Sequence, residues 1–179
     1  MPGLFIRMAT RKRLLALTAT LLLTLISFGY LLDTALFQQA KQEIDNRAHF
    51  FMDTMLAVRE YTSNDVNPII APLNFRSPQF LPEAVPSYAA TKVYTYLSGK
   101  KDYRQYLYRE ATLNPTNLKD RADTFEARII EIFRANPSSK EQEGIYTTAS
   151  GKLHYVARPI VISKASCLAC HSTPEKAPP

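Results

Sequence analysis

Near the start of the chain, positions 14–32 form a predominantly hydrophobic block of 19 residues that contains no charged residue. A helix rises about 1.5 Å per residue, so this block would span about 28 Å, close to the hydrocarbon thickness of a bilayer. It is longer than the usual apolar core of a signal peptide, and the large residues Leu32 and Phe37 stand where a cleavage site needs small ones. The block predicts an uncleaved transmembrane anchor, with a cleaved signal as the alternative.

After the anchor, hydrophobic positions recur every three or four residues, which is the period of one face of an α-helix. They run from Phe37 to Val58, with charged residues between them. We expect a long membrane-proximal helix whose apolar stripe faces the domain core or a second copy of the chain.

The remaining pattern mixes proline-rich, helical and strand-like segments. Five prolines within positions 68–86 predict a loop packed on the domain, because proline interrupts both helices and central strands. Spacing and composition predict helices at 87–97 and 118–135, a strand at 103–113 and a hairpin at 145–162. Helices and a few strands in one domain indicate an α+β fold with helices against one side of a sheet.

The charge of the chain is concentrated at its N-terminus. Lys and Arg total 22 against 16 acidic residues, giving a net charge of +6. Four of these bases precede the first acidic residue: Arg7, Arg11, Lys12 and Arg13. The rest of the chain is nearly neutral, which argues against nucleic-acid binding. Positive flanks stay in the cytoplasm, so we expect residues 1–13 to be cytoplasmic, 14–32 to cross the membrane, and 33–179 to form one extracytoplasmic domain.

The only two cysteines, Cys167 and Cys170, are followed directly by His171. This Cys-x-x-Cys-His pattern is typical of covalent haem attachment in c-type cytochromes. Residues three apart lie on one side of a helical turn, so both sulfurs can reach the two vinyl groups of one porphyrin. His171 can then bind the iron as the proximal axial ligand. Attachment in bacteria requires an extracytoplasmic compartment, which the anchor predicts independently.

Other chemistries also use cysteines at this spacing. In an oxidising compartment the pair could form a disulfide or a thioredoxin-like redox couple, although that couple normally follows a strand within a βαβ unit. A zinc ion would need a fourth ligand beside Cys167, Cys170 and His171, and only His49 or His154 could supply it. We predict one covalently attached haem c and keep the disulfide and zinc as alternatives.

The second axial position decides the chemistry, because two strong ligands suit electron transfer whereas an open face admits small molecules. The candidate distal ligands are His154, Met52, Met55, Tyr61 and His49. The methionines fit core packing equally well, and an open or water-held site is the remaining alternative. Candidates for pairing with the haem propionates are Arg59, Arg158 and Lys164.

Four further segments accompany the haem motif: Val-Arg-Glu-Tyr-Thr at 58–62, Tyr-Arg-Glu-Ala at 108–111, Asn-Pro-Thr-Asn at 114–117 and Ala-Arg-Pro-Ile at 157–160. With the motif, this ordered set resembles the haem-c-binding PAS-like family of membrane-anchored bacterial sensors and small cyanobacterial cytochrome-like proteins. The resemblance implies a PAS-like antiparallel sheet with flanking helices, haem bound through Cys167 and Cys170, and His171 as axial ligand. Some relatives use a third cysteine as the second axial ligand, and this sequence has none.

We therefore expect a membrane-anchored monohaem c-type cytochrome-like protein with a one-electron redox role. An enzyme is not expected, because no nucleophile, base and orienting group stand out together. Expected partners are the lipid bilayer, a redox complex or signalling partner in the same membrane, photosynthetic if the chain is cyanobacterial, and a second copy through the membrane-proximal helix. The compartment would be the periplasm or the thylakoid lumen. The alternatives are a haem-based redox or gas sensor acting through a separate partner, and an accessory haem subunit of a larger membrane complex.

Overall fold

The computed structural model describes residues 2–74, 76, 79–115, 117–149, 151–163, 165–168 and 171, with the side chains of residues 2–9 and 166 excepted. The chain divides into two compact units, residues 1–46 and residues 47–179. The first unit is helical throughout its described length, and the second contains the other helices and both strands.

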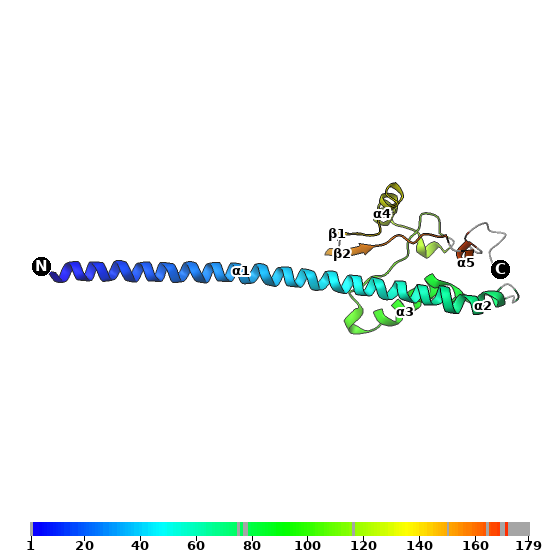
Figure 1. Cartoon of the computed structure of the whole chain (residues 1–179), viewed down its shortest axis with the longest axis horizontal. Helices are drawn as coiled ribbons and strands as arrows, with labels where there is room; N and C mark the ends of the chain where they lie inside the picture. Colours follow the sequence, from blue (N-terminus) through cyan, green and yellow to red (C-terminus); the bar gives the residue numbers. More distant parts are fainter. Residues whose placement is uncertain are drawn as a thin grey trace. The chain divides into compact units, whose positions relative to one another are not determined.

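Helix α1 runs without a break from Pro2 to Tyr61, so the predicted anchor and membrane-proximal helix are one element (Figure 1). Its proline at position 2 lies in the first turn, where a missing N–H group costs no helical hydrogen bond. Large apolar side chains of the 14–32 block are exposed, Ile26 for example by 69%. Among the described residues this is one helix long and apolar enough to cross a membrane, which supports a single-pass protein.

Threonine hydroxyl groups within the apolar block bond back to the helix. Thr20 Oγ1 donates to the carbonyl oxygen of Leu17 at 2.9 Å, and Thr24 Oγ1 donates to that of Leu21 at 2.8 Å. Such bonds satisfy the hydroxyl groups without water, which a segment surrounded by hydrocarbon requires. The threonines are therefore compatible with a membrane span.

The predicted proline loop begins later than expected. A π-helical turn at Thr62–Val66 continues α1, and α2 extends over Asn67–Asn74 through two prolines. Pro68 is the second residue after the wide π-helical turn, in the first turn of α2, where a residue without an N–H group is tolerated. Pro72 lies in the last turn of α2, so the helix ends soon after it.

The loop after α2 is closed by the buried side chain of Asn74, which is 3% exposed. Its Nδ2 donates to the carbonyl oxygen of Leu81 at 3.1 Å, and its Oδ1 accepts from the Leu81 N–H at 2.6 Å. A 3-10 turn at Pro82–Ala84 follows. This paired contact satisfies a buried amide and ties the described end of the loop to the domain.

Helix α3 spans Pro86–Ser98, as the pattern predicts to within a residue at each end. The predicted strand at 103–113 is wrong: a 3-10 turn occupies Lys101–Tyr103, and the following residues are irregular. Thr112 forms an isolated bridge with Arg121. Aromatic and β-branched composition favours strands only where a partner strand is available, and none pairs with this segment in the described chain.

Helix α4 spans Thr124–Ala135, and a 3-10 turn at Leu118–Asp120 precedes it. The observed helix therefore begins six residues later than the predicted start at position 118. A capping box sets its start. The Asp123 carboxylate accepts from the Glu126 N–H at 2.8 Å, and the Glu126 carboxylate accepts from the Asp123 N–H at 2.9 Å. These two bonds satisfy donors that the first turn leaves open.

The predicted hairpin is confirmed as β1 over Gln142–Thr148 and β2 over Gly151–Ala157, paired antiparallel. Gly144 lies opposite Tyr155, and a Cβ atom at Gly144 would come within 3.0 Å of the tyrosine ring. The absence of a side chain at Gly144 therefore lets the Tyr155 ring lie close against the strand. A short helix, α5, follows at Ala165–Leu168. The described fold is α+β, with one small antiparallel sheet and flanking helices.

Aromatic pairs join the helices of the second unit to one another and to the hairpin. Phe51 of α1 stacks on Tyr106 at a centroid distance of 5.3 Å, while Phe125 of α4 stacks on Tyr146 of β1 at 3.9 Å. Met55, the largest fully buried side chain of the described residues, lies one turn after Phe51. Phe125 also meets Tyr155 of β2 edge to face at 4.9 Å, so the hairpin packs one face on α4.

Candidate functional site

The structure describes three residues of the Cys-x-x-Cys-His motif, Cys167, Leu168 and His171, and the first two end the short helix α5. Cys167 lies on α5 and is half-buried. The His171 N–H donates to the Cys167 carbonyl oxygen at 2.9 Å, which is the hydrogen bond of an α-helical turn. This hydrogen bond brings the backbones of the first cysteine and the histidine close together. Cys170 lies outside the described residues.

Apolar side chains beside the motif are exposed to solvent. Their exposed fractions are 42% for Ile160, 75% for Val161, 42% for Ile162 and 43% for Leu168. Adjacent exposed hydrophobic residues on a small domain commonly mark a surface that something else covers. These four residues lie within seven positions of Cys167 in sequence.

The candidate distal ligands lie in different environments. Met55 is fully buried in the core and Met52 is half-buried, whereas Tyr61 is 62% exposed. His154 is half-buried on β2, opposite Ile145. Burial of Met55 fits its core interpretation, and the identity of the second axial ligand stays a prediction.

The first predicted propionate partner, Arg59, is already paired within the protein. Its guanidinium forms an ion pair with the Glu110 carboxylate, and the two side chains are only 16% and 14% exposed. Tyr108 donates to the other oxygen of Glu110 at 2.6 Å. Arg59 and Glu110 come from two of the segments that carry the family resemblance. These segments therefore meet in space and form a largely buried polar triad of Arg59, Tyr108 and Glu110.

The triad holds the Tyr108 phenol in its protonated form. Burial, followed by the adjacent Glu110 carboxylate, raises the pKa of Tyr108 well above its usual range. A phenol whose pKa is higher in the folded state stabilises that state at lower pH, and this contribution is lost as the pH rises above the unfolded value of about 10.

We therefore expect a pH-dependent difference between the native protein and Tyr108→Phe. Between about pH 9 and about pH 11, the free energy of unfolding should fall more steeply in the native protein, by at most about 1.4 kcal/mol per pH unit. Urea denaturation at several pH values measures both slopes. Equal slopes would show that Tyr108 ionises as readily folded as unfolded.

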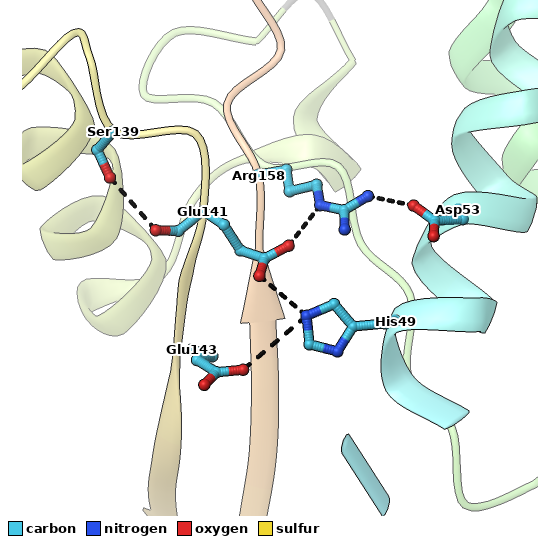
Figure 2. Close-up of polar contacts among 6 residues, drawn as sticks. All are labelled: His49, Asp53, Ser139, Glu141, Glu143 and Arg158. Atoms are coloured by element: carbon cyan, nitrogen blue, oxygen red, sulfur yellow. Dashed lines mark hydrogen bonds and ion pairs between the residues drawn. The ribbon is translucent and has the colours of Figure 1, made fainter. Parts of the chain in front are cut away.

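A second polar cluster joins α1 to the hairpin, and we call it the helix–hairpin network: His49, Asp53, Glu141, Glu143 and Arg158 (Figure 2). His49 Nε2 lies 2.9 Å from Glu141 Oε1 and 3.9 Å from Glu143 Oε2. Arg158, the second predicted propionate partner, binds Glu141 through Nε at 2.6 Å and also pairs with Asp53. The network therefore links three segments that are far apart in sequence.

The charges of this network stabilise one another. The hydrogen bond from His49, the largest favourable effect, and the contacts with Arg158 lower the pKa of Glu141 below its usual value. Hydrogen bonds to Asp53 and then to Glu141 raise the pKa of Arg158. Glu141 is thus held ionised at neutral pH, with one carboxylate oxygen toward Arg158 and the other toward His49.

Sequence reasoning missed this network as a site, although it named His49 and Arg158 individually. Glu141 and Glu143 are two residues apart, so in an extended strand they point to the same side, opposite the face that packs on α4. This alternation could have been used to predict that the two glutamates share a face. The position of His49 beside them could not be predicted, because it depends on how α1 packs against the hairpin. Lys164, the third predicted propionate partner, lies outside the described residues.

The observations define the chain as an α+β domain with a hydrophobic N-terminal helix and a C-terminal Cys-x-x-Cys-His segment. The model of the Tll0287-like family, described as Tll0287, matches residues 37–179. The match covers most of the chain, so the protein belongs to the Tll0287-like family, which is named after a cyanobacterial protein. No curated protein and no solved structure matches the chain.

Proposed function

We propose that the protein is a membrane-anchored monohaem c-type cytochrome-like protein that transfers one electron at a time to or from a membrane partner. The observation that carries the proposal is the contiguous Cys167–His171 motif, which contains both cysteines of the chain. The helical hydrogen bond from His171 to Cys167 supports it, since covalent attachment needs the motif to turn.

Each residue of the motif would have a distinct task. Cys167 and Cys170 would hold the porphyrin by thioether bonds, and His171 would bind its iron through a neutral imidazole nitrogen. The exposed apolar residues at positions 160–162 would pack on the ring and keep water from it. When bound, the haem supplies reversible one-electron oxidation and reduction of its iron.

The native pairs of Arg59 and Arg158 limit their proposed role toward the propionates. Both guanidinium groups already pair with carboxylates of the protein, and Arg59 is the more buried of the two, at 16% exposed against 24%. Either arginine could bind a propionate only by sharing or exchanging its present partner. Their direct task is to join segments of the domain.

We further propose that α1 anchors the protein with its N-terminus in the cytoplasm and residues 33–179 in the periplasm or thylakoid lumen. The cluster of bases before the apolar block supports this orientation. Protease added to spheroplasts should then cut the domain, and complete protection would overturn the orientation. A PAS-like arrangement of the domain also stays a proposal, supported by the antiparallel hairpin and its flanking helices.

A haem-based sensor is the second candidate. It is favoured by one observation: α1 continues from the apolar block into the domain, where the helix–hairpin network ties it to the hairpin. A change at the domain could therefore reach the membrane through α1 and act on a separate partner.

Carbon monoxide separates the two candidates, because it binds reduced haem iron only where an axial position is open. We expect the visible spectrum of the reduced full-length protein to be unchanged by carbon monoxide, as two firm ligands require. A shifted spectrum would show an accessible iron and favour the gas sensor over the electron-transfer protein.

A further inference from the structure

His49, Glu141 and Glu143 bring three side chains of metal-ligating chemistry together, away from the cysteine motif in sequence. One imidazole nitrogen and one oxygen from each carboxylate lie within 4.8 Å of one another. Figure 2 shows both carboxylates directed at the same imidazole nitrogen, Nε2 of His49. We propose that these three residues bind a divalent transition-metal ion of the Zn²⁺ type.

The distances suit such an ion after small side-chain adjustments. Zn²⁺ binds nitrogen and oxygen at about 2.0–2.2 Å, so two ligands of a tetrahedral site lie about 3.3–3.5 Å apart. His49 Nε2 is 2.9 Å from the Glu141 oxygen and 3.9 Å from the Glu143 oxygen, values on either side of that separation. Opening the first contact and closing the second would need only rotations of side chains.

The backbone already supports this geometry. Glu143 lies on β1, and Glu141 is the residue just before this strand begins. Strand alternation therefore places both carboxylates on the face opposite Tyr146. Tyr146 is stacked on Phe125 of α4, which fixes that orientation of the strand. The face with the two carboxylates is therefore turned to His49 by packing that does not depend on the metal.

Arg158 acts as a positioning residue for the site. Its Nε donates to Glu141 Oε2 at 2.6 Å, which leaves Oε1 directed at His49. Its Nη1 pairs with Asp53, so the guanidinium is itself held from α1. Metal-binding carboxylates are usually oriented by outer hydrogen bonds of this kind, and their loss typically lowers metal affinity about 10–100-fold.

The ligand set selects the class of ion. An imidazole and two carboxylates without sulfur suit Zn²⁺ and neighbouring divalent transition metals, whereas Ca²⁺ and Mg²⁺ prefer oxygen alone. Glu143 is 54% exposed, so an ion can enter from solvent and keep water as a further ligand. Since His49 comes from α1 and the carboxylates from the hairpin, bound metal would cross-link these elements.

Calorimetric titration with ZnCl₂ tests the site. The sample is the full-length chain in detergent, expressed with the cytochrome c maturation machinery and treated with a chelator to remove loosely bound metals. We expect one saturable equivalent of Zn²⁺, and at least about 10-fold weaker binding in Glu143→Gln and Arg158→Gln. Glu131→Gln is the matched control, because Glu131 forms an exposed ion pair with Arg134 on α4. The control should bind as the native chain does.

Glu143→Gln is the decisive variant, because it changes an exposed side chain and should leave the fold intact, which a thermal melt verifies. Absence of saturable binding, or equal affinity in Glu143→Gln and the native chain, would overturn the site and leave an ion-pair network. The Zn²⁺ titration is repeated in the double variant Cys167→Ser/Cys170→Ser, which cannot attach haem and leaves His171 as a competing ligand. A site at His49 predicts that the Glu143-dependent equivalent of Zn²⁺ persists in this variant.

Discussion

Replacing Cys167 and Cys170 together by alanine should abolish covalently bound haem. The proposed thioether bonds need both sulfur atoms, and the sequence contains no other cysteine that could substitute. Expressed with the cytochrome c maturation machinery, the native chain should retain haem staining on a denaturing gel, and the double variant should lose all of it. This is an all-or-none effect, the largest that we expect.

Leu168→Ala provides the matched control, because it lies between the cysteines and carries no attachment chemistry. It should keep the covalent haem while removing part of an exposed apolar side chain beside it. Staining that persists in the double cysteine variant would refute attachment at this motif. Absence of staining in the native chain would instead favour the alternative interpretations of the two cysteines, a disulfide or a zinc site.

Replacing Arg59 by methionine should lower the free energy of unfolding by about 3 kcal/mol, the lower end of the range for breaking a buried ion pair. The substitution keeps much of the side-chain volume but leaves Glu110 as a buried carboxylate, 14% exposed, without its cation. The Tyr108 hydroxyl would be the remaining partner of that carboxylate among the contacts described for the triad. Urea denaturation of the two proteins measures the difference.

Arg134→Met is the control for this substitution. Arg134 also pairs with a glutamate, Glu131, but the two side chains are 61% and 60% exposed, and such a pair contributes about 0–1 kcal/mol. Arg59→Met combined with Glu110→Leu should recover part of the loss, because no charge is then left buried. If Arg59→Met costs no more than Arg134→Met, the triad is not a stabilising element of the domain.

The elements that could be predicted from the sequence are those with local signals. The α1 helix follows from its apolar block and its three-to-four spacing, and the hairpin follows from two β-rich arms around a turn. The capping box of α4 could also have been predicted from the sequence, since an aspartate and a glutamate stand three residues apart before an apolar run. Its omission explains why the start of α4 was placed too early.

The errors have a common physical cause, which is dependence on packing. Residues 103–113 have the composition of a strand but lack a partner strand in the described chain. Their aromatic residues pack on helices instead, Tyr106 against Phe51 of α1 and Tyr108 against Tyr94 of α3. Pro68 enters α2 next to a π-helical turn, and Pro72 lies in the last turn of that helix. Neither outcome is encoded in local composition.

The candidate sites also differ in whether their residues are neighbours in sequence. The Cys-x-x-Cys-His motif is contiguous, so its chemistry can be inferred from spacing alone. Arg59 and Arg158 were expected to face haem propionates, but the structure pairs them with Glu110 and with Glu141 and Asp53. Those partners lie far from the arginines in sequence, and only the fold brings them together.

A spectroelectrochemical titration of the full-length protein in detergent tests the central claim most directly. It records visible absorbance against applied potential. The proposed function predicts a haem band that is reduced reversibly in a one-electron step, with about 59 mV per tenfold change in the ratio of oxidised to reduced protein. Absence of a haem band, or a haem band that does not follow a one-electron curve, would contradict it.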